Sequence, residues 1–75
     1  MPLVQVQHLA GAFTEEQQKA LISDITNAFV RVSGEGIRKN VLITVNEIQS
    51  GLWATGGHPL TIEEVRKRQA ERQGE

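Results

Sequence analysis

Pro2 is the residue of this sequence best suited to acid–base chemistry near neutral pH. A methionine ahead of a small residue such as proline is normally removed during maturation, and the chain would then begin with a secondary amine. An ordinary α-amino group has a pKa of about 7.7–8.0, and an apolar pocket or a nearby arginine lowers that pKa. The free amine could then act as a general base and its conjugate as an acid. The alternative is that Pro2 is only a strand-end residue.

Other catalytic chemistry has little support in the sequence. The chain has no cysteine, which excludes a thiol nucleophile, a disulfide and a cysteine-ligated metal site. Neither histidine stands in a local cluster with Asp or Glu, so we expect no metal site. No phosphate-binding or dinucleotide-binding glycine motif is present.

Several charged side chains are candidates for binding a substrate. Arg38 follows a glycine turn, from which its side chain could reach the Pro2 of a neighbouring subunit and bind a carboxylate. His58 lies in a loop and could supply a hydrogen-bond donor. Each also has a simpler interpretation as a solvated surface residue. We expect Arg31 to be a surface residue and His8 to be a half-exposed structural residue.

The composition is that of one ordinary domain spanning residues 1–75. The hydrophobic fraction is 39% and the formal net charge is −1, so nucleic-acid binding has no electrostatic support. No apolar run approaches the roughly 20 residues that a membrane span needs, and no secretory signal is visible. We therefore expect a cytoplasmic protein that binds neither nucleic acid nor membranes.

Two strands and a long helix are predicted to position these residues. Residues 3–9 read as a strand, and Thr14 with Gln17 forms a capping box that begins a helix. Gly34 and Gly36 are predicted to end that helix. The run 41–45 is rich in β-branched residues, as in a strand covered on both faces. The helix carries a stripe of apolar residues on one face: Leu21, Ile22, Ile25, Ala28, Phe29 and Val32.

This order predicts an α/β fold, a βαβ unit whose strands are parallel. Residues 50–57 suggest a hairpin or loop, and Pro59 leads into a short helix over about 62–72. The last residues, about 73–75, are expected to form a frayed tail. A single helix covers only one face of a two-stranded sheet, so the other, apolar face needs a second copy, which predicts at least a dimer.

The layout resembles the 4-oxalocrotonate tautomerase family over positions 1 to about 61. The most specific parts are Pro2 with the strand that follows it, and the glycine-rich segment Ser50–Gly57. A subgroup of that family also carries Gly-Glu-Gly with an arginine two residues on, as in Gly34–Gly36 and Arg38, and the motif Gly-Gly-x-Pro-Leu-Thr, as in Gly56–Thr61.

The resemblance implies a βαβ fold paired into dimers, and chains of this length usually assemble as hexamers. It implies that the processed proline moves a proton between an oxygen and a carbon of an enol acid, without cofactor or metal. Arginines would hold the carboxylate of this small acid. Trp53 falls where the best-known members have a pocket phenylalanine, and would keep the pocket apolar.

The best-known members also carry two arginines at positions that here hold Ala12 and Leu42. Arg38, Arg31 and His58 are the nearest substitutes, so the usual dicarboxylate substrate does not follow. Two other functions stay open. One is hydration, dehalogenation or decarboxylation, which needs an activated water and usually a carboxylate such as Glu47. The other is a non-catalytic oligomeric module that binds a small acid.

Overall fold

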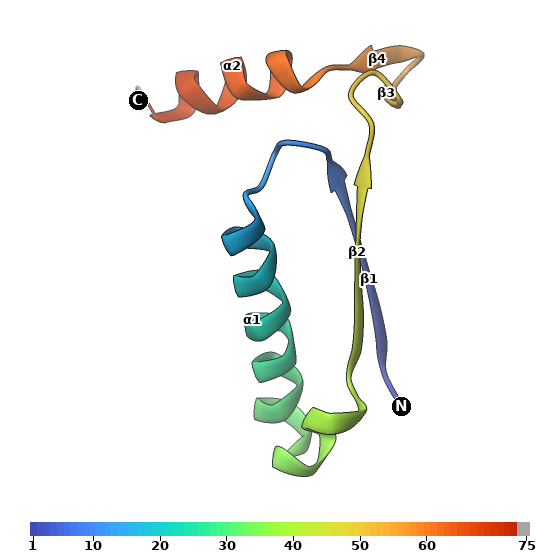
Figure 1. Cartoon of the computed structure of the whole chain (residues 1–75), viewed down its shortest axis with the longest axis vertical. Coiled ribbons are helices and arrows are strands. Elements are labelled where there is room, and N and C mark those ends of the chain that lie inside the picture. The colour runs from blue at the N-terminus through green and yellow to red at the C-terminus, as the bar shows by residue number, and fades with distance from the viewer. Residues whose placement is uncertain (74–75) are drawn as a thin grey trace. The chain divides into compact units, whose positions relative to one another are not determined.

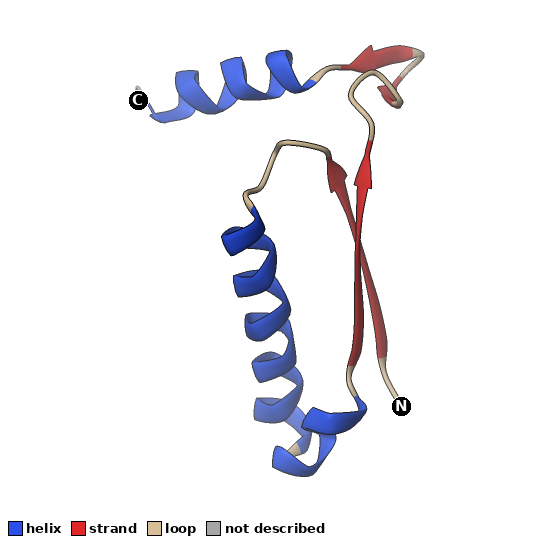
Figure 2. Cartoon of the chain, viewed as in Figure 1, coloured by secondary structure: helices blue, strands red, loops and turns tan. Residues whose placement is uncertain are grey.

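The computed structural model describes residues 1–73 (Figures 1 and 2). The elements follow in the order β1 (Leu3–Leu9), α1 (Glu15–Ser33), the 3-10 helix η1 (Glu35–Asn40), β2 (Leu42–Ile48), β3 (Trp53–Thr55), β4 (His58–Leu60) and α2 (Ile62–Gln73). Helix α2 thus continues one residue beyond its predicted end. The rest of the expected frayed tail, 74–75, lies outside the described residues.

Strands β1 and β2 lie side by side and run in the same direction (Figure 1). Leu42 N donates a hydrogen bond to Pro2 O at 2.9 Å where both strands begin. Ala10 N donates to Ile48 O at 2.7 Å where both strands end. The predicted βαβ unit with parallel strands is therefore confirmed.

Helix α1 begins and ends as its sequence predicts. Thr14 Oγ1 accepts a hydrogen bond from Gln17 N, and Gln17 Oε1 accepts one from Thr14 N, which completes the capping box. Gly34, at φ 90°, ends the helix with a hydrogen bond from its N–H to Val30 O. Gly36 does not end the helix, and its φ is not positive. It lies inside η1, an element that the sequence did not predict.

Burial alternates along both β1 and β2, so one face of the pair is covered and the other is open. Leu3 and Leu42 are exposed on the open face, while Val4 and Ile43 are partly covered. A single copy of the chain therefore leaves the second face of β2 open, and its predicted coverage depends on a second copy. The middle of this face is polar rather than apolar, with Gln5, Gln7, Thr44 and Asn46, whereas its apolar residues Leu9 and Ile48 at the strand ends are covered or partly covered.

The apolar stripe of α1 is only partly buried. Leu21, Ile25 and Phe29 are half-buried, as the periodicity predicts. Ile22 is more exposed, and Val32 is 82% exposed, so the prediction fails for these two residues. One copy therefore leaves apolar surface uncovered at the carboxyl end of this helix.

The chain forms two compact units. The first contains 1–6 and 13–46, and the second contains 7–12 and the described residues from 47 onward. In the second unit β3 and β4 pair antiparallel, with Trp53 opposite Leu60, which confirms the predicted hairpin. Ser50 Oγ accepts a hydrogen bond from Ile62 N at 3.0 Å and so anchors the start of α2.

Very little of the described chain is fully buried. Leu9 and His8 are 5% and 6% exposed, and they are the only described residues classed as buried. The expectation of a half-exposed His8 was therefore wrong. Its ring lies at the covered end of β1, and Nδ1 is 2.9 Å from Leu9 O. None of the described helices is both long and apolar enough to cross a membrane.

Candidate active site

Pro2 precedes the first residue of β1 and is half-buried. Its carbonyl oxygen is held by Leu42 N, so the start of the chain is fixed to β2. While Met1 is present, the Pro2 nitrogen belongs to the peptide bond between the two residues and has no basic lone pair. Met1 itself is exposed, which leaves this peptide bond open to an aminopeptidase.

Arg38 lies in η1 and is held by hydrogen bonds from two directions. Its Nε and Nη2 donate to the two carboxylate oxygens of Glu35, at 2.6 and 3.3 Å. Its Nη1 donates to Asn27 Oδ1 of α1, at 3.0 Å. The hydrogen bond from Arg38 holds the pKa of Glu35 below its ordinary value, and the Glu35 carboxylate raises the pKa of Arg38. Both groups are therefore charged at neutral pH.

The backbone brings the last turn of η1 close to Pro2. Val41 N donates to Arg38 O at 3.4 Å, and the next residue, Leu42, donates to Pro2 O. A shallow depression of about 550 Å³ lies on η1. Its lining residues are Glu35, Gly36, Arg38 and Lys39. The first unit thus combines the proposed base with a charged depression.

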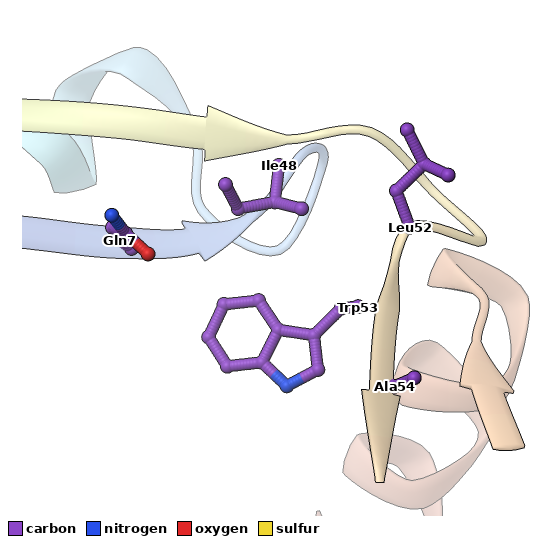
Figure 3. Close-up of a pocket in the computed structure, with 5 residues that line it drawn as sticks. All are labelled: Gln7, Ile48, Leu52, Trp53 and Ala54. Atoms are coloured by element: carbon purple, nitrogen blue, oxygen red, sulfur yellow. The ribbon is translucent and has the colours of Figure 1, made fainter. Parts of the chain in front are cut away.

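Trp53 lines a smaller depression in the second unit (Figure 3). The volume of this depression is about 240 Å³, and the other lining residues are Gln7, Ile48, Leu52 and Ala54. The indole ring extends from β3 toward Gln7 and Ile48, and Trp53 is 37% exposed. An exposed indole beside aliphatic side chains can form one wall of an apolar pocket.

His58 lies on the same face of the hairpin as Trp53. Thr55 is opposite His58 and Trp53 is opposite Leu60, and alternate residues of a strand share a face. His58 Nε2 is 3.4 Å from Glu64 Oε2, and both side chains are substantially exposed. The imidazole is therefore available to a ligand, although Glu64 competes for it.

The structure places the four predicted site residues in two pairs. Pro2 and Arg38 belong to the first unit, and Trp53 and His58 belong to the second. The two positions that carry no arginine are a half-buried Ala12 and an exposed Leu42. Of the other candidates, Arg31 is exposed in the last turn of α1, and Glu47 lies near the end of β2.

Sequence reasoning missed both partners of Arg38. Glu35 precedes Arg38 by three residues within η1, so its place in the Gly-Glu-Gly motif was an available signal. Asn27 carried no signal, because it lies on α1, eleven residues before Arg38. Among the described residues, no group of three or more His, Cys, Asp and Glu side chains could hold a metal ion.

Comparison with known proteins identifies the family. A family model described as tautomerase enzyme matches residues 2–63, which is most of the chain. The chain belongs to the tautomerase family. The match begins at Pro2 and includes β1, α1, η1, β2 and the hairpin. The described part of α2 lies almost entirely beyond it.

Individual tautomerases are similar in both sequence and fold. A probable tautomerase from Dickeya dadantii is 31% identical over 61 residues, which cover 81% of this chain and 90% of that protein. A 4-oxalocrotonate tautomerase isozyme from Methylibium petroleiphilum superposes with a TM-score of 0.67 at 29% identity, covering 77% of this chain and 90% of that one. YwhB, a 4-oxalocrotonate tautomerase homologue, gives a TM-score of 0.67 at 26% identity, with 77% and 92% covered.

Proposed function

We propose that this tautomerase interconverts the enol and keto forms of a small 2-oxo acid, with the amine of Pro2 as the proton carrier. Loss of Met1 frees the ring nitrogen. The neutral amine takes the proton from the enol oxygen, and the resulting ammonium group delivers a proton to carbon. The reaction needs no cofactor, because the electrons stay within the substrate.

The observation that carries this proposal is the family match that begins at Pro2. Two features of the structure support it. Pro2 is half-buried and its carbonyl is fixed to Leu42, so a freed amine would have a defined position. The backbone of Arg38 lies near it, since Val41 N donates to Arg38 O and the next residue donates to Pro2 O.

We propose that Arg38 binds the substrate carboxylate and that Trp53 and His58 line the pocket. Guanidinium groups bind carboxylates with two parallel hydrogen bonds, and Trp53 would shield the reacting atoms from water. His58 would donate a hydrogen bond to the substrate. Completing the pocket is the role that we assign to self-association, as a dimer or a hexamer.

The two other functions have weaker support. Hydration requires a carboxylate that activates water, and the exposed Glu47 near the carboxyl end of β2 is the candidate for that role. A non-catalytic module would bind an acid without any need for the Pro2 amine. The family model described as tautomerase enzyme, and a relative named as a probable tautomerase, favour tautomerisation over both.

The experiment is a comparison of the mature chain with Pro2→Ala. Phenylenolpyruvate and 2-hydroxymuconate are the enol substrates, and the loss of the enol form is followed by absorbance. We expect kcat/KM to fall by roughly 10², because general acid–base groups contribute about 10²–10⁴. Intact mass must show that Met1 is absent in both preparations.

The size of the assembly is the control, measured by sedimentation on the same samples. An enzyme that depends on Pro2 loses turnover while its assembly stays intact. Equal turnover of the two chains would remove Pro2 from the mechanism. Acid binding without turnover, equal in both chains, would favour the non-catalytic module.

A further inference from the structure

The guanidinium of Arg38 is held by its own chain in a way that the proposed reaction does not explain. Glu35 accepts from Nε and Nη2, and Asn27 accepts from Nη1. A guanidinium has five N–H donors, so these three hydrogen bonds leave two donors for a ligand. Each of these donors can form a charge-assisted hydrogen bond with a carboxylate oxygen.

Stability does not account for this arrangement. The side chains of Arg38 and Glu35 are 46% and 73% exposed, and exposed ion pairs contribute little to folding. The two-sided contact does fix the direction of the planar guanidinium, however. A side chain that is already oriented loses less conformational freedom when a ligand binds.

Glu35 also changes the charge that a ligand would meet. The depression on η1 is lined by two cations, Arg38 and Lys39, and by one anion, Glu35. Its formal charge is therefore +1, which balances one carboxylate. Leu42, whose N–H binds Pro2 O, adds no charge at the start of β2.

We infer that Glu35 and Asn27 are positioning residues for Arg38, and that Glu35 makes this site prefer a monocarboxylate to a dicarboxylate. The inference rests on the proposed function, because it takes Arg38 as the group that binds the substrate of Pro2. Glu35 acts by orienting the guanidinium and by repelling a second negative charge. Asn27 acts by orientation alone.

The test is the substrate preference of Glu35→Gln, which keeps a hydrogen-bond acceptor and removes the charge. Phenylenolpyruvate carries one carboxylate, and 2-hydroxymuconate carries two. We expect the ratio of kcat/KM for 2-hydroxymuconate to kcat/KM for phenylenolpyruvate to rise roughly three- to tenfold. That is the size of effect that one unit charge has at about 4 Å in a water-exposed site.

Two control variants separate charge from position. Glu15→Gln makes the same change of net charge in the first turn of α1, where Glu15 Oε1 lies 3.1 Å from Lys19 Nζ in an exposed ion pair. This variant should leave the ratio of the two kcat/KM values unchanged. Asn27→Ala removes one hydrogen bond and no charge. It should raise KM for both substrates by similar factors, with little change in kcat.

An unchanged ratio in Glu35→Gln, or an equal rise in Glu15→Gln, would overturn the inference.

Wild-type turnover that does not depend on Pro2 would instead overturn the proposed function. In that case NMR titrations of the same variants with butyrate and succinate decide the inference. Glu35→Gln must then bind succinate more tightly relative to butyrate. No shift in that preference, or no carboxylate binding by the wild-type chain, would contradict it.

Discussion

At the scale of single residues, the ion pair between Glu35 and Arg38 has a defined pH dependence. The hydrogen bond from Arg38 lowers the pKa of Glu35 in the folded chain. The contribution of the pair to folding stability is then fully present above the ordinary pKa of glutamate. It is lost as the pH falls through the lower folded pKa. We expect NMR titration of the Glu35 carboxyl carbon to show this lowered pKa, and Arg38→Gln to bring the pKa back toward its ordinary value.

A Glu35 pKa that is equal in the wild-type chain and in Arg38→Gln would show that the two side chains do not interact in solution.

The residue types in the sequence predicted which side chains are candidates for the site, but not which neighbouring side chains hold them in place. Pro2 and Arg38 stand out in the sequence because few other groups suit acid–base chemistry or carboxylate binding. The contact between Arg38 and Asn27 could not be predicted, because it depends on how η1 folds back toward α1. His8 was misjudged from its residue type. It is in phase with Val4 and Val6 on the covered face of β1, so the alternation of the strand places it inside.

At the scale of elements, the capping box sets where α1 begins. Thr14→Ala removes the oxygen that accepts a hydrogen bond from Gln17 N at 3.1 Å. We expect the free energy of unfolding to fall by about 1 kcal/mol, within the 0.5–2 kcal/mol typical of lost N-caps. Chemical denaturation measures this change. Thr14→Ser keeps the acceptor and should lie close to wild type, and equal losses in the two variants would argue against the cap.

The turn after β1 requires a glycine at position 11. Gly11 has φ +89°, and a Cβ there would lie 3.1 Å from Ile62 Cγ1 of α2. We expect Gly11→Ala to destabilise the chain by at least about 1–2 kcal/mol, from the left-handed backbone alone, in thermal or chemical unfolding. Gly36→Ala is the matched control, since its φ is not positive and nothing lies within 4 Å. A similar cost at both positions would contradict this account of the turn.

Local signals explain which elements were predictable. Capping residues and apolar periodicity predicted β1, α1 and α2, with boundaries close to those observed. The 3-10 helix η1 was missed because a six-residue element is too short to show a periodicity. The continuous apolar run of β2 was interpreted as burial on both faces, but only one face is covered in a single copy.

At the scale of the whole molecule, one copy has too little buried surface to explain its own stability. Only Leu9 and His8 are buried among the described residues, while Leu42 and Val32 are 50% and 82% exposed. Small chains without disulfides or metals usually gain the missing burial from partner subunits. We therefore expect a homo-oligomer in solution, detectable by native mass spectrometry.

The open face of β1 and β2 is the surface that we expect to meet another copy. Leu42→Glu would place a charge on the face that also exposes Leu3, and it should shift the protein to smaller assemblies. Lys19→Glu changes an exposed position on α1 and should leave the size of the assembly unchanged. A wild-type chain that is monomeric at micromolar concentration would contradict this prediction.

The most direct test of the central claim relates turnover to the chemical state of the Pro2 nitrogen. Preparations with different extents of Met1 removal, quantified by intact mass, are assayed with phenylenolpyruvate under identical conditions. If Pro2 carries the proton, turnover rises in proportion to the fraction of chains that begin with proline, and it vanishes when every chain keeps Met1. Undiminished turnover by chains that all retain methionine would contradict the account.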